Sequence, residues 1–416
     1  MNKEKQIVPE LRFPEFEKDG EWEGKSIDKL SNKVTAGGTP STKEDKYWGG
    51  NIRWMNSGEL NLKVIYEVDG RITKEGLDNS STKLIPVDCV LIGLAGQGKT
   101  RGTVAINKVE LCTNQSIASI FPNKKVFDST FLYHNLDNRY KELRELSTGG
   151  EGRGGLNLGI IKEIKVPIPI SLKEQQKIAN CLSSLDEVIS AETEKLELLQ
   201  DHKKGLLQQL FPQEGETQPK YRFPEFKNEG DWEEKELKTF LEFQTGFPFK
   251  SSGFNKENKG IRLIKNRDLK ADDRIVYFEG SYNDDYLVND GDILVGMDGD
   301  FSPVKWNKGL ALLNQRVGRI RTNNDTNDFI FHFLSIHLKI IEHNTPSTTV
   351  KHLSHSTVEK LKVPIPSTIK EQQKIGKCLS SVDNLIEAQT LKIDRLQTHK
   401  IGLLQQLFPN INDVVV

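Results

Sequence analysis

Apolar residues recur at alternating spacings of three and four positions in two long stretches of the chain. A narrow stripe of this kind, sustained over about five heptads, is typical of helices that pair along a coiled-coil seam. Each stretch predicts a helix of about 40 residues, which is about 60 Å long at about 1.5 Å per residue. The stripes consist of Ile178, Leu182, Leu185, Ile189, Leu196, Leu199, Leu206 and Leu210, and of Ile375, Leu379, Val382, Ile386, Ile393, Leu396, Leu403 and Leu407.

Each predicted helix begins shortly after a proline. Ser171-Leu-Lys-Glu174 and Thr368-Ile-Lys-Glu371 both have the Ser/Thr-x-x-Glu pattern of a capping box. In that motif the hydroxyl and the carboxylate accept hydrogen bonds from amide groups that a helix start leaves unpaired. We therefore expect both helices to begin at these segments.

The helices belong to a tandem repeat. Val-Pro-Ile-Pro precedes each helix and Gly-Leu-Leu-Gln-Gln-Leu-Phe-Pro ends it, with the two copies 197 residues apart. Arg-Phe-Pro-Glu-Phe followed by a tryptophan recurs at an offset of 210 residues. The two halves thus have similar sequences at their ends and different sequences in the region between these ends. This predicts two similar but non-identical functional surfaces. The copies are residues 166–169 and 363–366, 205–212 and 402–409, and 12–16 with Trp22 and 222–226 with Trp232.

The connection between the halves predicts how the helices pair. Only the short polar stretch from Gln213 to Gln218 separates the first helix from the second unit. The second helix then most simply runs back along the first, so that both bury their stripes. We predict an α+β (mixed α/β) fold with two pseudo-symmetric units joined by two long antiparallel coiled-coil helices. The boundaries are 1–165 for the first unit, 166–212 for the first helix, 213–218 for the linker, 219–362 for the second unit and 363–410 for the second helix.

Short apolar, β-branched runs bounded by Gly and Asp predict strands in both units. Three runs of the first unit can be set against three of the second, although most of their residues differ. The units therefore read as small mixed α/β domains. The matched runs are 50–60 and 260–269, 87–92 and 291–295, and 113–117 and 313–317.

Composition excludes some classes of protein. The formal net charge is −1 and the isoelectric point about 6.7, which argues against a protein that coats nucleic acid through bulk positive charge. A local basic face stays possible. The four cysteines show no zinc-site spacing, and Cys181 and Cys378 are expected to be small buried helix residues. No secretory signal or membrane-spanning stretch is visible, so we expect a cytoplasmic protein without membrane association.

One motif suggests a nucleotide-binding P-loop. Gly93-Leu-Ala-Gly-Gln-Gly-Lys-Thr100 fits the G-x-x-x-x-G-K-[ST] pattern. A P-loop must open a helix, whereas the following Arg101-Gly-Thr-Val-Ala-Ile106 favours a strand. The corresponding Gly296-Met-Asp-Gly-Asp-Phe301 lacks the Gly-Lys pair. We prefer a glycine-rich loop that faces DNA phosphate, and keep nucleotide binding as an alternative. No other catalytic motif stands out.

The order of variable unit, helix, variable unit, helix is one part of a wider resemblance. Gly37-Gly-Thr-Pro-Ser41 precedes Tyr47-Trp48, two Asn-Gln pairs recur, and the helices carry Lys-Glu-Gln-Gln-Lys-Ile. With the flanking repeats, these motifs resemble the DNA specificity subunit of type I restriction-modification systems over essentially the whole chain. Gly246-Phe-Pro248 departs from the Gly-Gly-Thr-Pro-Ser form, so that loop's role cannot be transferred to the second unit.

The resemblance implies a non-catalytic subunit. Each unit would be a target-recognition domain that reads one half of a split, asymmetric site on double-stranded DNA. The helices would act as a ruler and as the dock for two methyltransferase subunits, and two restriction subunits would complete the assembly. No cofactor is implied for this chain, while S-adenosylmethionine, ATP and Mg are implied for the partners. A coiled-coil scaffold without sequence readout stays as the other alternative.

Base edges are read by Arg, Lys, Asn, Gln or acidic side chains, and phosphates are met by Lys, Arg and backbone amides. Polar loop residues of these types are candidates in both units, with a solvated surface residue as the alternative for each. Asn114, Gln115, Asn314 and Gln315 repeat so closely that we expect a structural role, because specificity should differ between the units. The DNA-binding candidates are Gln97, Lys99, Arg101, Arg153, Asn157, Lys265, Asn266, Arg267, Asp300, Lys305, Arg316, Lys351 and His352.

Overall fold

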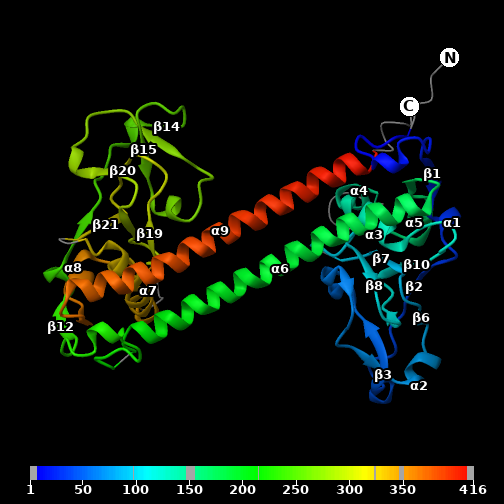
Figure 1. Cartoon of the computed structure of the whole chain (residues 1–416), viewed down its shortest axis with the longest axis horizontal. Helices are drawn as coiled ribbons and strands as arrows, with labels where there is room; N and C mark the ends of the chain where they lie inside the picture. Colours follow the sequence, from blue (N-terminus) through cyan, green and yellow to red (C-terminus); the bar gives the residue numbers. More distant parts are fainter. Residues whose placement is uncertain are drawn as a thin grey trace. The chain divides into compact units, whose positions relative to one another are not determined.

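The computed structural model describes residues 7–96, 98–146, 155–213, 215–322, 325–345 and 351–409. The chain forms two compact units (Figure 1). Unit 1 comprises Met1–Glu192 and Lys392–Val416, and unit 2 comprises Thr193–Leu391. The long helices α6 (Leu172–Leu210) and α9 (Ile369–Leu407), of 39 residues each, therefore contribute to both units. The predicted mixed fold with two long helices is confirmed.

The described residues of unit 1 form three sheets and five shorter α-helices. The central sheet has the order β2-β10-β7-β8-β4, a second has β5-β3-β9-β6, and β1 pairs with β11. The strands are β1 (Glu23–Ser26), β2 (Val34–Ala36), β3 (Trp48–Met55), β4 (Val64–Ile65), β5 (Arg71–Ile72), β6 (Leu84–Ile85), β7 (Val90–Gly93), β8 (Val104–Asn107), β9 (Leu111–Thr113), β10 (Ile117–Ile120) and β11 (Lys165–Ile168). The helices are α1 (Ile27–Leu30), α2 (Lys74–Asp78), α3 (Ser129–Asn138), α4 (Tyr140–Glu145) and α5 (Leu158–Glu163).

Unit 2 repeats this plan. Its sheets have the orders β13-β21-β18-β19, β14-β16-β15-β20-β17 and β12-β22. The strands are β12 (Glu233–Glu236), β13 (Leu241–Thr245), β14 (Phe254–Asn255), β15 (Ile261–Ile264), β16 (Val276–Phe278), β17 (Leu287–Val288), β18 (Ile293–Gly296), β19 (Pro303–Lys305), β20 (Ala311–Leu313), β21 (Val317–Thr322) and β22 (Lys362–Ile365). The shorter helices are α7 (Asn327–Asn344) and α8 (His355–Glu359).

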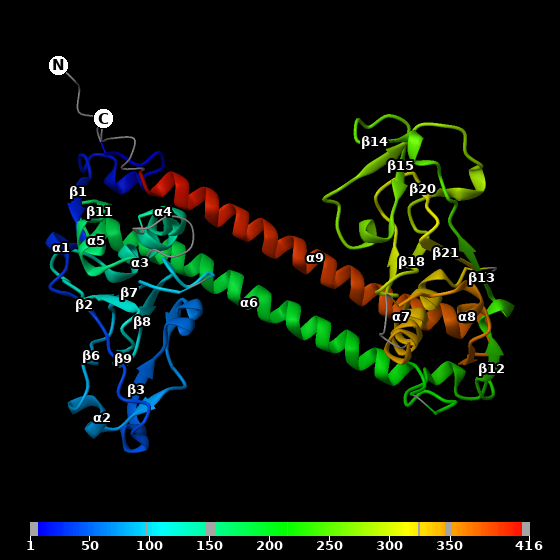
Figure 2. The ribbon, with the colours of Figure 1, turned by 180° about the vertical axis from the view of Figure 1, so that it is seen from behind.

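The core of unit 1 lies between the central sheet, α3 and the long helices. All residues of β7, β8 and β10 are buried, as expected for apolar strands covered on both faces. Ile178 and Leu182 of α6 join this core, and so do Leu407 and Phe408 from the end of α9. The start of α6 thus packs beside the end of α9. Figure 2 shows α3 next to the same part of α6 from behind.

Ion pairs confirm that the helices run antiparallel. In unit 1, Asp186 of α6 pairs with Lys400 of α9, and Glu192 pairs with Lys392 at 2.6 Å. As the residue number rises along α6, the residue number of its partner on α9 falls, as expected for antiparallel helices. Unit 2 contains its own pair between the two helices, Lys203 with Asp383 at 2.5 Å.

An aromatic cluster explains why Leu-Phe-Pro ends both helices. In unit 1, Phe131 of α3 lies 5.8 Å from Trp22 and 5.3 Å from Phe408, between ring centroids. In unit 2, Phe211 lies 6.5 Å from Trp232 and 5.6 Å from Phe329 of α7. Phe408, which follows α9, thus packs in the core of unit 1, and Phe211, which follows α6, packs in the core of unit 2. Such aromatic pairs contribute about 0.5–1.5 kcal/mol beyond the area they bury.

A buried histidine joins each domain to its long helix. His134 of α3 lies 3.1 Å from the hydroxyl of Ser183, and His332 of α7 lies 3.3 Å from that of Ser380. Burial lowers the pKa of His134 to about 3 and that of His332 to about 4. Both rings are therefore neutral near pH 7, which suits a hydrogen bond inside the core.

The capping-box prediction is correct for the hydroxyls and wrong for the carboxylates. The amide of Glu174 donates to Ser171 Oγ at 3.4 Å, and Thr368 does the same for Glu371 at 3.3 Å. Neither carboxylate returns to the helix start. Glu174 instead accepts two 2.8 Å hydrogen bonds from Arg12 and one of 3.2 Å from the Trp22 indole. A bidentate guanidinium is a stronger partner than a single backbone amide.

The same arrangement recurs in unit 2. Glu371 accepts two 2.7 Å bonds from Arg222 and one of 3.2 Å from the Trp232 indole. Both carboxylates are only 1% exposed. The hydrogen bond to Glu174 is the main reason why the pKa of Arg12 is raised above its usual value. These ion pairs explain why Arg-Phe-Pro-Glu-Phe, the tryptophan and the helix start repeat together.

The two Asn-Gln pairs form a turn that a glycine contacts closely in each unit. The side chains of Asn114 and Asn314 accept from backbone amides within their own turns, at 3.0 and 2.9 Å. A Cβ at Gly37 would lie 1.9 Å from the carbonyl oxygen of Thr113, and one at Gly246 would lie 2.1 Å from that of Asn314. Only glycine fits there. The asparagines therefore have the structural role predicted for them, and Gly246 occupies the place of Gly37.

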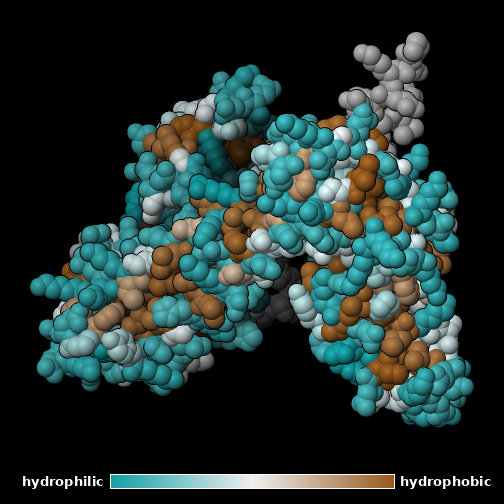
Figure 3. Space-filling view, turned by 45° about the vertical axis from the view of Figure 1, so that its right-hand side comes forward, coloured by the Kyte–Doolittle hydropathy of each residue, from teal (hydrophilic) through white to brown (hydrophobic). Residues whose placement is uncertain are grey.

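Cys181 and Cys378 are half-buried rather than buried, because they lie beside the apolar stripe of their helices. No helix within the described ranges is both long and apolar enough to cross a membrane. The face drawn in Figure 3 is mostly hydrophilic, with hydrophobic residues gathered in patches.

Candidate nucleic-acid interface

In both units, the loop after a central strand meets a segment from much later in the chain. We call residues 94–103, between β7 and β8, loop 1, and residues 297–302, between β18 and β19, loop 2. The amide of Leu156 donates to Leu94 in loop 1 at 2.9 Å, and that of Leu353 donates to Met297 in loop 2 at 2.8 Å. Candidate residues far apart in the sequence thus come together at equivalent places.

Loop 1 is held by α4. The Tyr140 hydroxyl donates to the carbonyl of Lys99 at 2.9 Å, and Arg144 Nη1 donates to the carbonyl of Gly98 at 2.5 Å. The Lys99 side chain is exposed, whereas Arg101 is half-buried. Because the carbonyl groups of Gly98 and Lys99 are bound, this part of the backbone is held against α4 while the Lys99 side chain stays exposed.

The path of loop 1 argues against a P-loop. Gly93 ends β7, the chain turns at Gly102 with φ +79°, and β8 begins at Val104. No helix opens after Thr100, so no row of helical amides is available for phosphates. The strand expected after Thr100 is confirmed.

Loop 2 gathers more polar groups. Asp298 accepts from Nδ1 of His352 at 2.9 Å and lies 3.6 Å from Nη1 of Arg316. Its backbone carbonyl accepts from the side-chain amide of Asn266 at 2.7 Å. The amide of Gly299 donates to the carbonyl of Lys351 at 2.9 Å. Amide and guanidinium groups, which commonly read base edges, are therefore concentrated around one loop together with an imidazole.

A second carboxylate of loop 2 is also paired. Asp300 lies 2.8 Å from the ammonium of Lys270 and accepts from the amide of Ser302 at 2.8 Å. The hydrogen bond from Lys270 is the main reason why the pKa of Asp300 is lowered to about 2. Asn266, Arg267, Asp298 and Asp300 also line a cavity of about 230 Å³.

Residues 19–201 and 229–398 both match the model of a protein family described as the type I restriction modification DNA specificity domain. The two matches together span most of the chain. The chain belongs to this family.

Similarity to specificity subunits extends over most of the chain's length. The MjaIX specificity subunit of Methanocaldococcus jannaschii is 28% identical over 380 residues, covering 83% of each chain. The EcoBI specificity subunit of Escherichia coli is 36% identical over 158 residues, which cover 37% of this chain and 33% of the subunit. The S subunit structure from M. genitalium superposes with a TM-score of 0.64 at 17% identity, covering 97% of this chain and 100% of that one. The structural similarity establishes the fold.

Membership in the family gives the chain a role in DNA sequence specificity. A specificity subunit is the non-catalytic part of such a system. Neither the nucleotide-binding alternative nor the scaffold alternative is supported by these similarities.

Not every predicted DNA-binding residue of this specificity subunit belongs to the two loops. Asn157 accepts from the amide of Ile160 at 3.0 Å and so caps α5. The ammonium of Lys265 lies 4.5 Å from the ring centroid of Phe254, and burial lowers its pKa. Lys305 pairs with Asp328 of α7. These three side chains have partners within the protein, and their contact with DNA stays a prediction. Gln97 and Arg153 lie outside the described residues.

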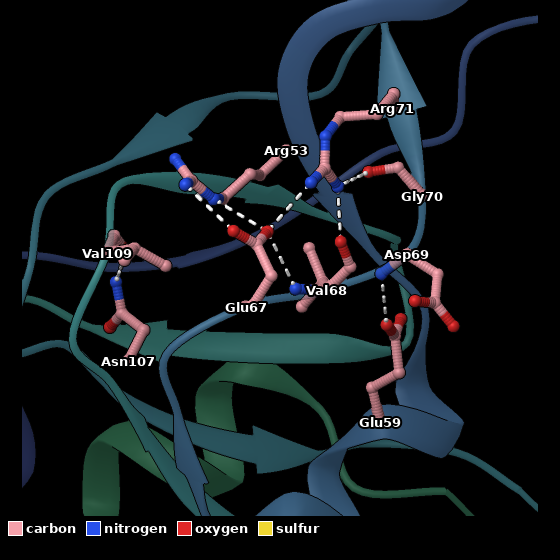
Figure 4. A network of polar contacts seen from close by, with 9 residues as sticks. All are labelled: Arg53, Glu59, Glu67, Val68, Asp69, Gly70, Arg71, Asn107 and Val109. Atoms are coloured by element: carbon pink, nitrogen blue, oxygen red, sulfur yellow. Dashed lines mark hydrogen bonds and ion pairs between the residues drawn. The ribbon is translucent and has the colours of Figure 1, made fainter.

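The sequence reasoning missed a charged cluster on β3 and β5. Arg53 and Arg71 are cross-strand neighbours, an arrangement that is unfavourable for like charges. The Glu67 carboxylate lies between them (Figure 4), accepting two 2.9 Å bonds from Arg53 and one of 2.8 Å from Arg71. The hydrogen bond from Arg53 is the main reason why the pKa of Glu67 is lowered to about 2. Two cations share one carboxylate, which leaves one positive charge.

Unit 2 has an equivalent cluster. β3 pairs in parallel with β9 as β15 does with β20, and the two registers place Arg262 where unit 1 has Arg53. Asp272 accepts from Arg262 at 2.5 Å and from Lys308 at 3.0 Å. The Arg262 guanidinium also lies 4.8 Å from the ring centroid of Trp306. The matched runs 50–60 and 260–269 contained the available signal, because an arginine follows the first isoleucine of each, as Ile52-Arg53 and Ile261-Arg262.

Proposed function

We propose that the two globular domains read the two halves of a split, asymmetric site on double-stranded DNA, one through loop 1 and the other through loop 2. The observation that carries this proposal is the equivalent position of the loops, combined with their different chemistry. Loop 1 presents Lys99, whereas loop 2 presents two carboxylates with Arg316 and His352 beside them. Different side chains on equivalent loops suit two unlike half-sites.

We further propose that two methyltransferase subunits and two restriction subunits join this chain. They would supply adenine methylation with S-adenosylmethionine, and DNA cleavage driven by ATP with Mg. Exposed apolar residues on the long helices support docking of partners there, namely Val188 and Leu198 of α6 and Leu385 and Leu391 of α9. The complex would act in the cytoplasm, where its DNA substrate is.

DNA binding is expected to depend on these partners. With a net charge of −1, the isolated chain has no excess of positive charge to hold DNA. We expect weak, salt-sensitive binding by the chain alone and tight specific binding once methyltransferase subunits are added. Fluorescence anisotropy with a cognate and a scrambled duplex measures both states. Equal affinity with and without partners would contradict the proposal.

Phosphate contacts should be the same in both domains, because the DNA backbone carries no sequence information directly. The Arg53 and Arg262 clusters meet that expectation, since each holds a guanidinium at an equivalent place with one unbalanced positive charge. We propose that Arg53, whose side chain is 36% exposed, contacts a phosphate next to one half-site. The Arg262 side chain is only 11% exposed, so in the second cluster Lys308, which is 30% exposed, would make that contact. Glu67 and Asp272 would keep these cations oriented before DNA arrives.

Replacing Arg53 with glutamine is expected to weaken DNA binding by the assembled complex without changing its recognition sequence. Loss of one phosphate contact should reduce the slope of log affinity against log salt by about 1. Titrations at several salt concentrations measure the slope. Lys74→Gln is a matched control, because Lys74 lies on α2 of the same domain and is 75% exposed in a pair with Asp78. An unchanged slope for Arg53→Gln, or an altered recognition sequence, would exclude a phosphate contact.

A further inference from the structure

Asp298 connects three candidate readers that come from separate parts of unit 2. Asn266 begins the short 3-10 helix η7 (Asn266–Leu269), Arg316 lies in the turn between β20 and β21, and His352 precedes α8. All three contact Asp298, the first through its backbone carbonyl and the other two through its carboxylate. Asp298 itself was not a candidate from the sequence.

The carboxylate of Asp298 is less exposed than the two side chains that it contacts. The side chain of Asp298 is 27% exposed, whereas those of His352 and Arg316 are 49% and 57% exposed. A ligand that approaches loop 2 would therefore meet the imidazole and the guanidinium more readily than the carboxylate.

The carboxylate also determines which imidazole nitrogen carries the proton. An ionised carboxylate can only accept hydrogen bonds, so Nδ1 of His352 must be the donor in the 2.9 Å contact. A neutral ring then presents an acceptor at Nε2, which can pair with the amino group of adenine or cytosine. Without the carboxylate, both tautomers would be accessible and that preference would be lost.

Backbone hydrogen bonds that do not involve this side chain also hold loop 2. Gly299 donates to Lys351 at 2.9 Å, and Leu353 donates to Met297 at 2.8 Å. These two bonds hold the segment before α8 against loop 2. Asparagine at position 298 would have nearly the same size as aspartate, and the backbone carbonyl that accepts from Asn266 would stay in place. The change would remove the negative charge, and with it a side chain that can only accept hydrogen bonds.

We propose that Asp298 is a positioning residue that sets the specificity of one half-site, by orienting His352 and Arg316 toward base edges. The proposal rests on the proposed function and names the group on which the second domain's readout depends. Arginine pairs with guanine through two parallel hydrogen bonds. The orientation of Arg316 therefore decides whether both bonds can form.

The test is Asp298→Asn in the full chain, produced with a compatible modification subunit, followed by mapping of methylated adenines across the DNA of the host. We expect one half-site to become degenerate at one or two positions, with discrimination there reduced by about tenfold or more. The other half-site and the spacer should stay as in the parent. Asp273→Asn is the matched control, because it removes a carboxylate that is 63% exposed in the same domain.

Arg316→Gln and His352→Gln test the proposal independently of Asp298. Both are expected to relax positions in the same half-site that Asp298→Asn relaxes. The proposal is overturned if Asp298→Asn leaves the motif unchanged. It is also overturned if Asp298→Asn abolishes methylation at every site while the two reader variants keep the parental motif, which would make Asp298 a purely structural residue. Failure of the proposed function itself looks different, because the parent chain would then give no split motif.

Discussion

Replacing Glu174 with alanine is expected to lower the free energy of unfolding of unit 1 by about 3–5 kcal/mol, because it leaves a buried charge without its partner. The Arg12 side chain is 9% exposed and Glu174 only 1%. The Trp22 indole would lose its acceptor as well. Amide hydrogen exchange followed by mass spectrometry measures the effect, since it reports the opening of each unit separately.

Two variants serve as controls for this result. Glu371→Ala should weaken unit 2 by a similar amount and leave unit 1 protected, because Glu371 binds Arg222 in the same way. Glu15→Ala removes an exposed ion pair with Lys177 in unit 1 and should cost less than about 1 kcal/mol. An effect of Glu174→Ala no larger than that of Glu15→Ala would show that the buried pair contributes little. Equal loss of protection in both units would show that it is not specific to unit 1.

Adding one heptad to both long helices is expected to lengthen the unread spacer of the DNA site without altering either half-site. Seven residues extend a helix by about 10 Å. At about 3.4 Å per base pair, the spacer should grow by up to about three base pairs. The insertions belong between Glu192 and Lys203 in α6 and between Asp383 and Lys392 in α9, which keeps the interhelical ion pairs of each unit intact. Mapping of methylated adenines gives the new spacer directly.

The length and placement of these insertions provide the control. A heptad preserves the apolar stripe, whereas four residues added to α6 alone would shift one stripe against the other. We expect that shorter insertion to abolish methylation. A spacer that stays the same after the paired heptad insertion would mean that helix length does not determine half-site separation.

The helices and strands were predictable because their signals are local. The alternating stripe predicted about 40 residues for each long helix, and α6 and α9 have 39. Runs of β-branched residues predicted strands, and two of the three matched pairs reappear as β3 with β15 and β7 with β18. The third prediction was wrong, because residues 114–116 and 314–316 form the turns between two strands. The antiparallel order followed from the short linker, since connectivity left no simpler way to bury both stripes.

Contacts between distant segments were not predictable in the same way. The capping-box pattern of Ser171 to Glu174 was correctly recognised, but the carboxylate binds an arginine 162 positions earlier. No local rule could weigh that partner against the amide of the helix start. Likewise, Asn266, Arg316 and His352 were separate candidates, and only the fold brings them to Asp298. Asp298 had no sequence signal of its own, because its importance lies in what it contacts.

The measurement that most directly tests the central claim is single-molecule sequencing of DNA from cells that carry this chain and a compatible modification subunit. Two unlike reading loops on one chain predict a new split motif, with methylated adenines on both strands and an unread spacer between unlike halves. A confirmed stable complex that produces no new motif, or only an uninterrupted one, would contradict the account.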